Sequence, residues 1–161
     1  MIYTDSRPSM IVKRNNTVRF KDIERRAQTL TDDQVNLEFL TPTRIKHEGR
    51  FISQPPFHVI VRNVLRRVSS LYYFHCGEQW QFDYRGTIER AQAIRSAELD
   101  TRWVDWERYS GRQKARMKMG GFVGEAVYEG DLAEFRPLLL LGQLVHIGKA
   151  CVFGNGRYEI R

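Results

Sequence analysis

The sequence predicts an α+β fold of the ferredoxin-like type, in which an antiparallel sheet carries two helices on one face. Its first support is periodicity: apolar residues alternate with polar ones in some segments and recur every three or four positions in others. The second is order, because these segments follow one another as strand, helix, strand, strand, helix, strand. That βαββαβ order is the split βαβ arrangement.

The first half of this unit is a strand followed by a helix. In the segment 34–45, apolar residues alternate with polar neighbours until Pro42 interrupts the pattern, which is typical of a half-buried strand. In the segment 57–74 the apolar spacing changes to three and four, which indicates an amphipathic helix. The polar side of this helix carries Arg62, Arg66 and Arg67.

The second half repeats the pattern after a short connection. A shorter helix is expected over 87–97, and the segment 96–110 is rich in aromatic and β-branched residues, as strands are. The segment 118–130 predicts a third strand. A helix is predicted over 132–148, where the proline falls in the first turn, and a last strand over 151–160.

Length and composition favour one soluble domain that binds a polyanion. The chain has 161 residues, 42% hydrophobic and 28% charged, which is ordinary for a globular protein. Its net charge of +7 favours an anionic partner without specifying the fold. We divide the chain into a basic N-terminal segment, 1–30, interpreted as the remnant of a missing first domain, and a ferredoxin-like domain, 31–161.

Several classes of protein do not fit the sequence. No run of about 18 apolar residues is present, and the N-terminus does not have the pattern of a secretory signal, so we expect a cytoplasmic protein that does not bind membranes. Cys76 and Cys151 have neither metal-site spacing nor a disulfide framework around them. We expect no metal and no cofactor.

A row of cations precedes the third predicted strand. Positive residues recur at every second position of the segment 110–121, and mostly apolar residues fill the alternate positions. In an extended strand, all the cations of this row lie on one face. The row is either a solvated outer face or a surface for a phosphate backbone, whose counterions are released on binding. Its members are Arg112, Lys114, Arg116 and Lys118.

Glycine and positive charge are concentrated in the segment 146–157. The order of residues matches neither a Walker loop nor a dinucleotide fingerprint. Gly148 can end the preceding helix. Gly154 and Gly156 suit a bulged start of the last strand, where another backbone such as RNA approaches closely, although a plain helix-to-strand turn is the alternative. Lys149 and Arg157 supply the charge.

The four histidines are scattered along the chain. His58 and His75 fall within or at the end of the first predicted helix, where surface or capping roles are typical. His47 lies in a polar turn beside cations, and His146 stands at the start of the glycine-rich segment. These two are candidate general bases, and a structural role is the alternative for each.

Taken together, these segments resemble the CRISPR-associated endoribonucleases that process precursor CRISPR RNA, within the repeat-associated mysterious protein (RAMP) superfamily. The resemblance covers most of the chain from about residue 34 onward. The C-terminal glycine-rich loop is the hallmark of the superfamily. The matching segments are LTPTR at 40–44, LRR at 65–67, WVDWERYSGRQKARMKMGGFVGE at 103–125 and LLLGQLVHIGKACVFGNGRYEI at 139–160.

The resemblance implies a RAMP or RRM-like domain that binds CRISPR repeat RNA. Relatives cut one phosphodiester without metal: a 2′-hydroxyl attacks the adjacent phosphorus, and a cyclic phosphate remains. Members of the family typically have two such domains, and their usual catalytic histidine belongs to the one that this chain lacks. The resemblance and the charge pattern together predict RNA contacts by Arg44, Arg112, Lys114, Arg116, Lys118, Gly148, Lys149, Gly154, Gly156 and Arg157.

Three functions stay open at this point. The chain is an RNA-binding component of precursor processing, a non-catalytic subunit that packs in a CRISPR complex, or a domain that binds a small phosphorylated ligand in its glycine loop. Possible partners besides repeat RNA are other CRISPR-associated proteins, a missing N-terminal half, and a second copy of the chain as a homodimer.

Overall fold

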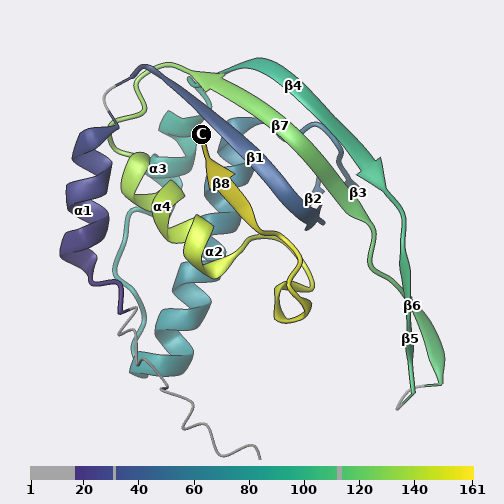
Figure 1. Ribbon diagram of the computed structural model, residues 1–161. Coiled ribbons are helices and arrows are strands. Elements are labelled where there is room, and N and C mark those ends of the chain that lie inside the picture. Colours follow the sequence, from purple (N-terminus) through teal and green to yellow (C-terminus); the bar gives the residue numbers. More distant parts are fainter. Residues whose placement is uncertain (1–16, 31, 112–113) are drawn as a thin grey trace, which may run out of the picture.

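The computed structural model describes residues 17–30, 32–111 and 114–161 of the chain (Figure 1). A four-stranded antiparallel sheet with the strand order β4-β7-β1-β8 forms its centre. Its strands are β1 (Gln34–Thr43), β4 (Arg95–Val104), β7 (Gly121–Glu129) and β8 (Tyr158–Ile160). Helices α2 (Phe57–Cys76) and α4 (Arg136–Val145) complete the βαββαβ unit. The predicted ferredoxin-like fold is confirmed.

The core lies between the sheet and the two helices, which cover one face of it (Figure 1). Alternate residues of β1, including Leu37 and Phe39, are buried against apolar residues of α2 and α4. The hydroxyl groups of two buried tyrosines donate hydrogen bonds to backbone carbonyls. Tyr158 donates to the Leu139 oxygen at 2.6 Å, and Tyr128 donates to the Pro55 oxygen at 2.8 Å. Burial raises the pKa of both hydroxyls.

Several boundaries differ from the predicted ones. The short helix α3 spans Tyr84–Ala91, because the Asp83 carboxylate accepts a hydrogen bond from the Gly86 backbone and caps an earlier start. The strand expected over 96–110 is interrupted after Val104. The strand expected over 151–160 is shorter: Cys151–Phe153 form a 3₁₀ turn, η1, a turn follows, and only Tyr158–Ile160 pair with β1.

Two small hairpins lie outside the main sheet. The first pairs β2 (Lys46–His47) with β3 (Arg50–Phe51), and the sequence analysis did not predict it. The second pairs β5 (Glu107–Ser110) with β6 (Ala115–Lys118) and extends from the ends of β4 and β7 away from the body (Figure 1). No helix in the described part of the chain is both long and apolar enough to cross a membrane.

An additional helix, α1 (Phe20–Thr29), packs against α4, and the sequence analysis did not predict it. Charged residues dominate α1, but Ile23 and Ala27 share one face and form a small buried cluster with Leu140. The structure therefore joins the end of the N-terminal segment to the ferredoxin-like unit. The interpretation of residues 1–30 as a domain remnant stays a prediction, and residues 1–16 lie outside the described part.

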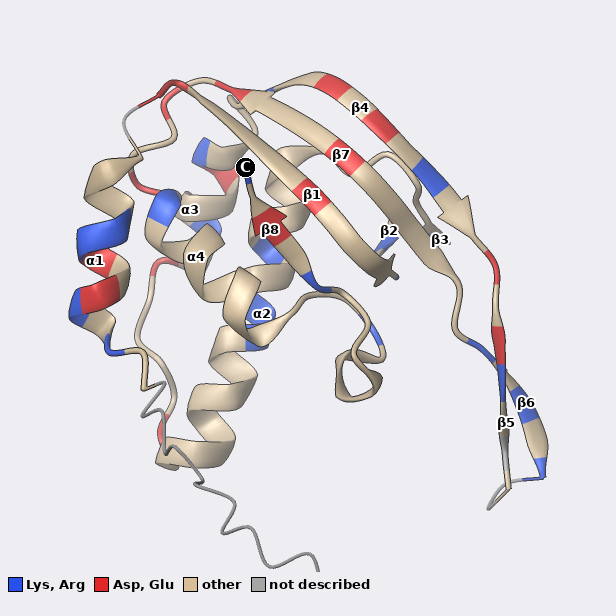
Figure 2. Cartoon of the chain, viewed as in Figure 1, with Lys and Arg blue, Asp and Glu red and all other residues tan. Residues whose placement is uncertain are grey.

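The outer face of the sheet carries a row of carboxylates that crosses all four strands (Figure 2). In register, Asp100 lies opposite Glu125, Glu125 opposite Glu38, and Glu38 opposite Glu159. Their side chains point away from the core, since residues next to them on the strands, such as Leu37, Phe39 and Ala126, are buried in it. Like charges that face one another across strands repel, and we call this set the acidic row.

Arginines offset part of this repulsion. The Arg161 guanidinium pairs with Glu38, and that of Arg157 pairs with Glu159 at 2.7 Å. Glu125 accepts a hydrogen bond from the Asn36 side chain at 2.9 Å. Two carboxylates of the acidic row are therefore paired with arginines near the C-terminus, and a third is hydrogen-bonded to a residue of β1.

The buried face of α1 gives a test of its packing. We expect Ile23→Ala to lower the free energy of unfolding by about 2 kcal/mol, because it removes apolar contacts and leaves a cavity. Phe20→Ala is the matched control, since Phe20 is 59% exposed on the same helix and contributes little. Urea denaturation measures both. An Ile23→Ala variant as stable as the parent would show that α1 does not pack on α4 in solution.

Candidate nucleic-acid interface

The glycine-rich loop, residues 146–157, is fastened to the end of β1 by backbone and side-chain hydrogen bonds. The Lys149 N–H donates to the Arg44 carbonyl oxygen at 2.9 Å, and the Gly156 N–H donates to the Pro42 carbonyl oxygen at 3.2 Å. The Thr41 hydroxyl donates to the Gly154 carbonyl oxygen at 2.9 Å. These three hydrogen bonds to residues 41–44 fix the conformation of the loop.

Two of the three loop glycines are required by the chain itself. A Cβ on Gly156 would lie 1.8 Å from the Ile147 carbonyl oxygen, and one on Gly148 would lie 2.7 Å from the Arg44 carbonyl oxygen. Both glycines also have positive φ. The backbone that lies close to Gly156 is therefore that of Ile147 in the protein itself, and not that of a bound RNA. Around Gly154, in contrast, nothing lies within 4 Å of an added Cβ, so open space is left beside this glycine alone of the three.

Gly148 does not end the preceding helix as predicted. Helix α4 ends at Val145, and the positive φ of +60° at its C-terminus falls on His146. Gly148 lies two residues further on, where its φ of +86° brings its backbone against Arg44. Its role is therefore to attach the loop to β1.

The loop also contacts the β5–β6 hairpin. The Asn155 side chain, only 3% exposed, donates to the Met119 carbonyl oxygen at 3.1 Å. The Arg108 guanidinium lies over the Phe153 ring, 4.3 Å from its centroid, in a cation–π contact. Arg44 donates to the Lys118 carbonyl oxygen. These contacts bring together the two segments for which the sequence predicted RNA contacts.

The cation row itself differs from the expectation of a cationic and an apolar strand face. In β6, Ala115 is exposed and Met117 is only half-buried, because the two-stranded hairpin projects beyond the sheet and neither face is covered. Lys114 has a φ of +47° in the turn. Arg116 lies 3.7 Å from the Glu107 carboxylate on the paired strand β5, so one cation of the row has an anionic partner. Arg112 lies outside the described residues.

A cationic cleft of about 550 Å³ lies between the β2–β3 hairpin, α2 and the glycine-rich loop. Its charged lining comes from three elements that are distant in sequence. The lining residues are Lys46, Glu48, Gly49, Arg62, Asn63, Arg66 and Lys149. Of the predicted RNA-binding residues, Lys149 belongs to this lining; Lys46, Arg62 and Arg66 were not among the predicted residues. The arginine-rich polar side of α2 was the available signal for two of them.

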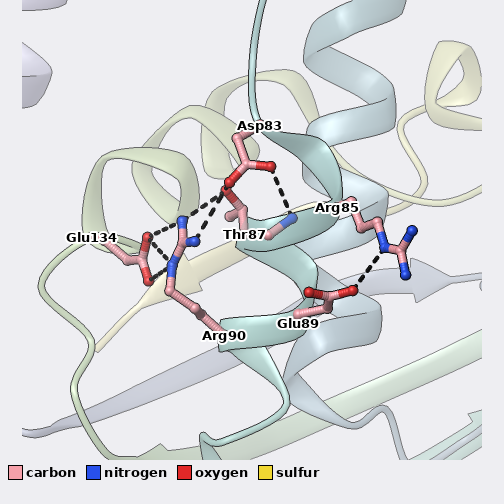
Figure 3. Close-up of polar contacts among 7 residues, drawn as sticks. Asp83, Arg85, Thr87, Glu89, Arg90 and Glu134 are labelled. Atoms are coloured by element: carbon pink, nitrogen blue, oxygen red, sulfur yellow. Dashed lines mark hydrogen bonds and ion pairs between the residues drawn. The ribbon is translucent and has the colours of Figure 1, made fainter.

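The cations of this cleft lack carboxylate partners among the described residues. Arg66 donates to the Asn63 amide oxygen at 3.0 Å, and the Lys149 ammonium lies 5.6 Å from the Phe51 ring centroid. Helix α3 shows the opposite arrangement (Figure 3): Arg85 pairs with Glu89, and Arg90 pairs with both Asp83 and Glu134. Cations of the cleft, unlike those of α3, have their charge available for an anionic ligand.

Two histidines meet at the edge of this cleft. The rings of His47 and His58 are in edge-to-face contact, with centroids 5.6 Å apart. Arg62 donates to His47 Nδ1 at 2.8 Å, so a neutral His47 carries its proton on Nε2. Burial, followed by the charges of His47 and Arg62, lowers the pKa of His58. From the sequence, a surface or capping role was expected for His58, and its contact with His47 was not predicted.

The second histidine candidate has the complementary tautomer. His146 Nδ1 lies 3.2 Å from the Asn155 carbonyl oxygen, which only accepts hydrogen bonds. Nδ1 therefore donates, and in the neutral ring Nε2 keeps a free lone pair. The Arg67 guanidinium donates to the carbonyl oxygen of the preceding residue, Val145, at 3.1 Å. His146 thus combines a base-competent nitrogen with a neighbouring cation.

Two predicted RNA contacts are engaged elsewhere in the protein. The guanidinium carbon of Arg44 lies 4.1 Å from the centroid of the Phe51 ring, in addition to the bond with the hairpin. Arg157 is paired with Glu159 beside the acidic row. Their direct contacts with RNA stay a prediction.

Within the described residues, no group of three or more His, Cys, Asp or Glu side chains is arranged to hold a metal ion.

Comparison with known proteins gives a consistent result. A family model described as CRISPR-associated endoribonuclease Cas6 matches residues 37–158. The fold is similar to a Thermus thermophilus Cas6, with a TM-score of 0.64 and 16% identity over 89% of this chain and 58% of that one. A Cas6 product complex is similar with a TM-score of 0.59 and 19% identity, over 86% of this chain and 56% of that one.

The chain thus spans less than two thirds of the length of these Cas6 structures. A partial Cas6-RT-Cas1–Cas2 complex also contains the fold, with a TM-score of 0.64 and 15% identity over 93% of this chain and 28% of that one. No curated protein sequence matches the chain.

The loop geometry predicts different outcomes for two glycines. Gly156→Ala should lower the free energy of unfolding by at least about 3 kcal/mol, because the Cβ collides with the Ile147 carbonyl and the backbone has positive φ. Gly154→Ala should cost about 1–2 kcal/mol, since only the strain of its positive φ applies. Thermal unfolding of both variants measures the difference. Equal losses would contradict the contact between Gly156 and Ile147.

Proposed function

The chain belongs to the CRISPR-associated endoribonuclease Cas6 family, and we propose that it binds CRISPR repeat RNA and takes part in the processing of precursor CRISPR RNA. The cationic cleft is the observation that carries this proposal. Its lysines and arginines come from three elements and outnumber its one carboxylate, Glu48, which lies 3.9 Å from His47 and forms no ion pair with them among the described residues. A phosphate backbone neutralises such a set and releases its own counterions, which is favourable at moderate salt.

Electrostatics favours one side of the molecule for the RNA. RRM domains stack bases on the outer face of their sheet. Here that face carries the acidic row, whose carboxylates repel phosphate. The cleft, the glycine-rich loop and α2 form the cationic alternative. We therefore place the RNA on the side of the loop and α2, with the hairpin cations Lys114, Arg116 and Lys118 extending the footprint beyond the loop.

We further propose that the chain holds the RNA while a second part completes the nuclease. The family resemblance assigns the usual catalytic histidine to another domain, and the chain covers only 56% and 58% of two Cas6 structures. That second part is a separate polypeptide, a preceding domain of which residues 1–30 are the remnant, or another copy in a homodimer. The cytoplasmic location expected from the sequence agrees with this proposed role.

A specific observation favours a second candidate, a self-sufficient endoribonuclease. Metal-independent cleavage needs a base that removes the proton of the attacking 2′-hydroxyl and an acid that protonates the departing 5′-oxygen, leaving a 2′,3′-cyclic phosphate. His146 has the tautomer that accepts a proton at Nε2, so it can serve as the base, whereas the neutral His47 ring presents its Nε2–H as a hydrogen-bond donor to a phosphate oxygen. Arg62 and Arg67 beside them supply positive charge for the crowded anionic transition state.

The cleft proposal predicts a salt-dependent loss of RNA binding. Arg62→Ala, Arg66→Ala and Lys149→Ala should each weaken binding of a repeat RNA about tenfold, because each removes a charged contact. Each should also flatten the logarithmic dependence of affinity on salt by about 0.7. Arg85→Ala is the matched control, because its guanidinium is paired with Glu89 on α3. Fluorescence anisotropy titrations at several salt concentrations measure all four variants.

Unchanged affinity in the three cleft variants would contradict the cleft as the RNA site. A loss in Arg85→Ala of the same size would mean that overall charge, rather than this cleft, governs the binding.

The RNA-holding role predicts binding without cutting. The full chain should bind a repeat RNA in the presence of a chelator and leave it intact. The same RNA with a single 2′-deoxy substitution at each linkage is the comparison, because it lacks the attacking hydroxyl at that linkage. Gel analysis of the products measures cleavage. Cutting that one substitution blocks, and that is lost in His146→Ala or His47→Ala, would instead establish the self-sufficient enzyme.

A further inference from the structure

A second cavity lies at the far end of α2, on the half of the helix that extends beyond the core. All the buried residues of α2 lie in its first half, from Phe57 to Leu65, and the second half is increasingly exposed. The cavity has a volume of about 420 Å³. Its lining residues are Ser69, Ser70, Tyr73, Phe74, Gln79, Trp80 and Tyr84, and we call it the aromatic groove.

The aromatic groove continues the cationic cleft along one face of α2. Arg62 and Arg66 line the cleft, and Ser70 and Tyr73 line the groove, at successive spacings of four, four and three residues. The Ser70 hydroxyl donates to the Arg66 carbonyl oxygen, four residues earlier on the helix, at 2.9 Å. From Arg66 to Tyr73 the helix axis rises by about 10 Å. A single strand of RNA that leaves the cleft along this face reaches the groove.

The rings of the groove are arranged as stacking surfaces. Trp80 lies nearly parallel to Phe82, with centroids 4.4 Å apart and an angle of 27°, and its backbone carbonyl accepts a hydrogen bond from the Tyr84 hydroxyl at 3.1 Å. Opposite this fixed side, Phe74 is 79% exposed and Tyr73 is 52% exposed. Such exposed rings beside an ordered aromatic pair offer a face on which a planar base stacks.

The polar part of the lining fits bases better than an apolar protein segment. Ser69, Ser70 and Gln79 supply hydroxyl and amide groups that both donate and accept hydrogen bonds, as the edges of unpaired bases require. None of the lining residues is a carboxylate, so the groove does not repel the phosphates of a strand that enters from the cleft. Continuity with the cleft supplies the positive charge that steers such a strand.

We propose that the aromatic groove binds unpaired nucleotides adjoining the RNA segment held in the cationic cleft, by stacking one or more bases on Tyr73 and Phe74. This inference rests on the proposed function, since it extends the RNA footprint from the cleft. Stacking in the groove tolerates any base and does not depend on salt, because it releases no counterions. Phosphate binding in the cleft, in contrast, depends on salt.

The test uses the full chain and a fluorescently labelled oligouridylate of about ten nucleotides. The double variant Tyr73→Ala/Phe74→Ala keeps the helix, since alanine favours helix and both rings are largely exposed. We expect it to bind the probe about ten- to a hundredfold more weakly than the parent, with the same salt dependence. Phe20→Ala, which removes an exposed ring from α1, is the matched control and should bind as the parent does.

The outcomes separate this inference from the proposed function. If Arg66→Ala weakens and flattens binding while Tyr73→Ala/Phe74→Ala binds as the parent does, the groove proposal is overturned and the cleft stands. If the double variant binds RNA normally but sediments as a smaller species than the parent, the groove is a protein contact. A parent chain that binds neither this probe nor repeat RNA overturns both proposals.

Discussion

The attachment of the glycine-rich loop to residues 41–44 at the end of β1 is the constraint on which the candidate interface depends. The backbone carbonyls of Pro42 and Arg44 accept hydrogen bonds from N–H groups of the loop. The Arg44 side chain donates a hydrogen bond to the Lys118 carbonyl at the base of the β5–β6 hairpin. Because β1 is a central strand of the sheet, the rigid core positions both elements. Without this attachment, Lys149 would not be held at the cleft with the α2 arginines.

Charged residues of opposite sign gather on two different sides of the molecule. The acidic row occupies the outer face of the sheet, and its carboxylates find partners in Arg157 and Arg161. The cleft concentrates unpaired cations on the other side. A net charge of +7 alone does not reveal this division, since cations on α3 are neutralised by nearby carboxylates. For RNA, the relevant quantity is the number of cations without local partners, and their position relative to the loop.

The sequence predicted the βαββαβ order because its periodicities and stop signals are local properties. It did not predict α1, whose charged sequence shows only Ile23 and Ala27 as core residues and is stabilised by contact with α4. Nor did it separate the loop glycines by role, since the collision of a Gly156 Cβ with Ile147 exists only in the folded loop. The pairing of His47 with His58 and the cleft itself likewise depend on residues that tertiary structure brings together.

We propose that RNA lies along the loop and α2 and avoids the outer face of the sheet. Ultraviolet cross-linking of a bound repeat RNA, followed by mass spectrometry of the attached peptides, tests it most directly. Cross-links should concentrate in peptides that contain residues 62–74 of α2 and residues 148–154 of the loop. Cross-links concentrated instead in the peptides of the acidic row, around Glu38 and Glu125, would contradict this placement.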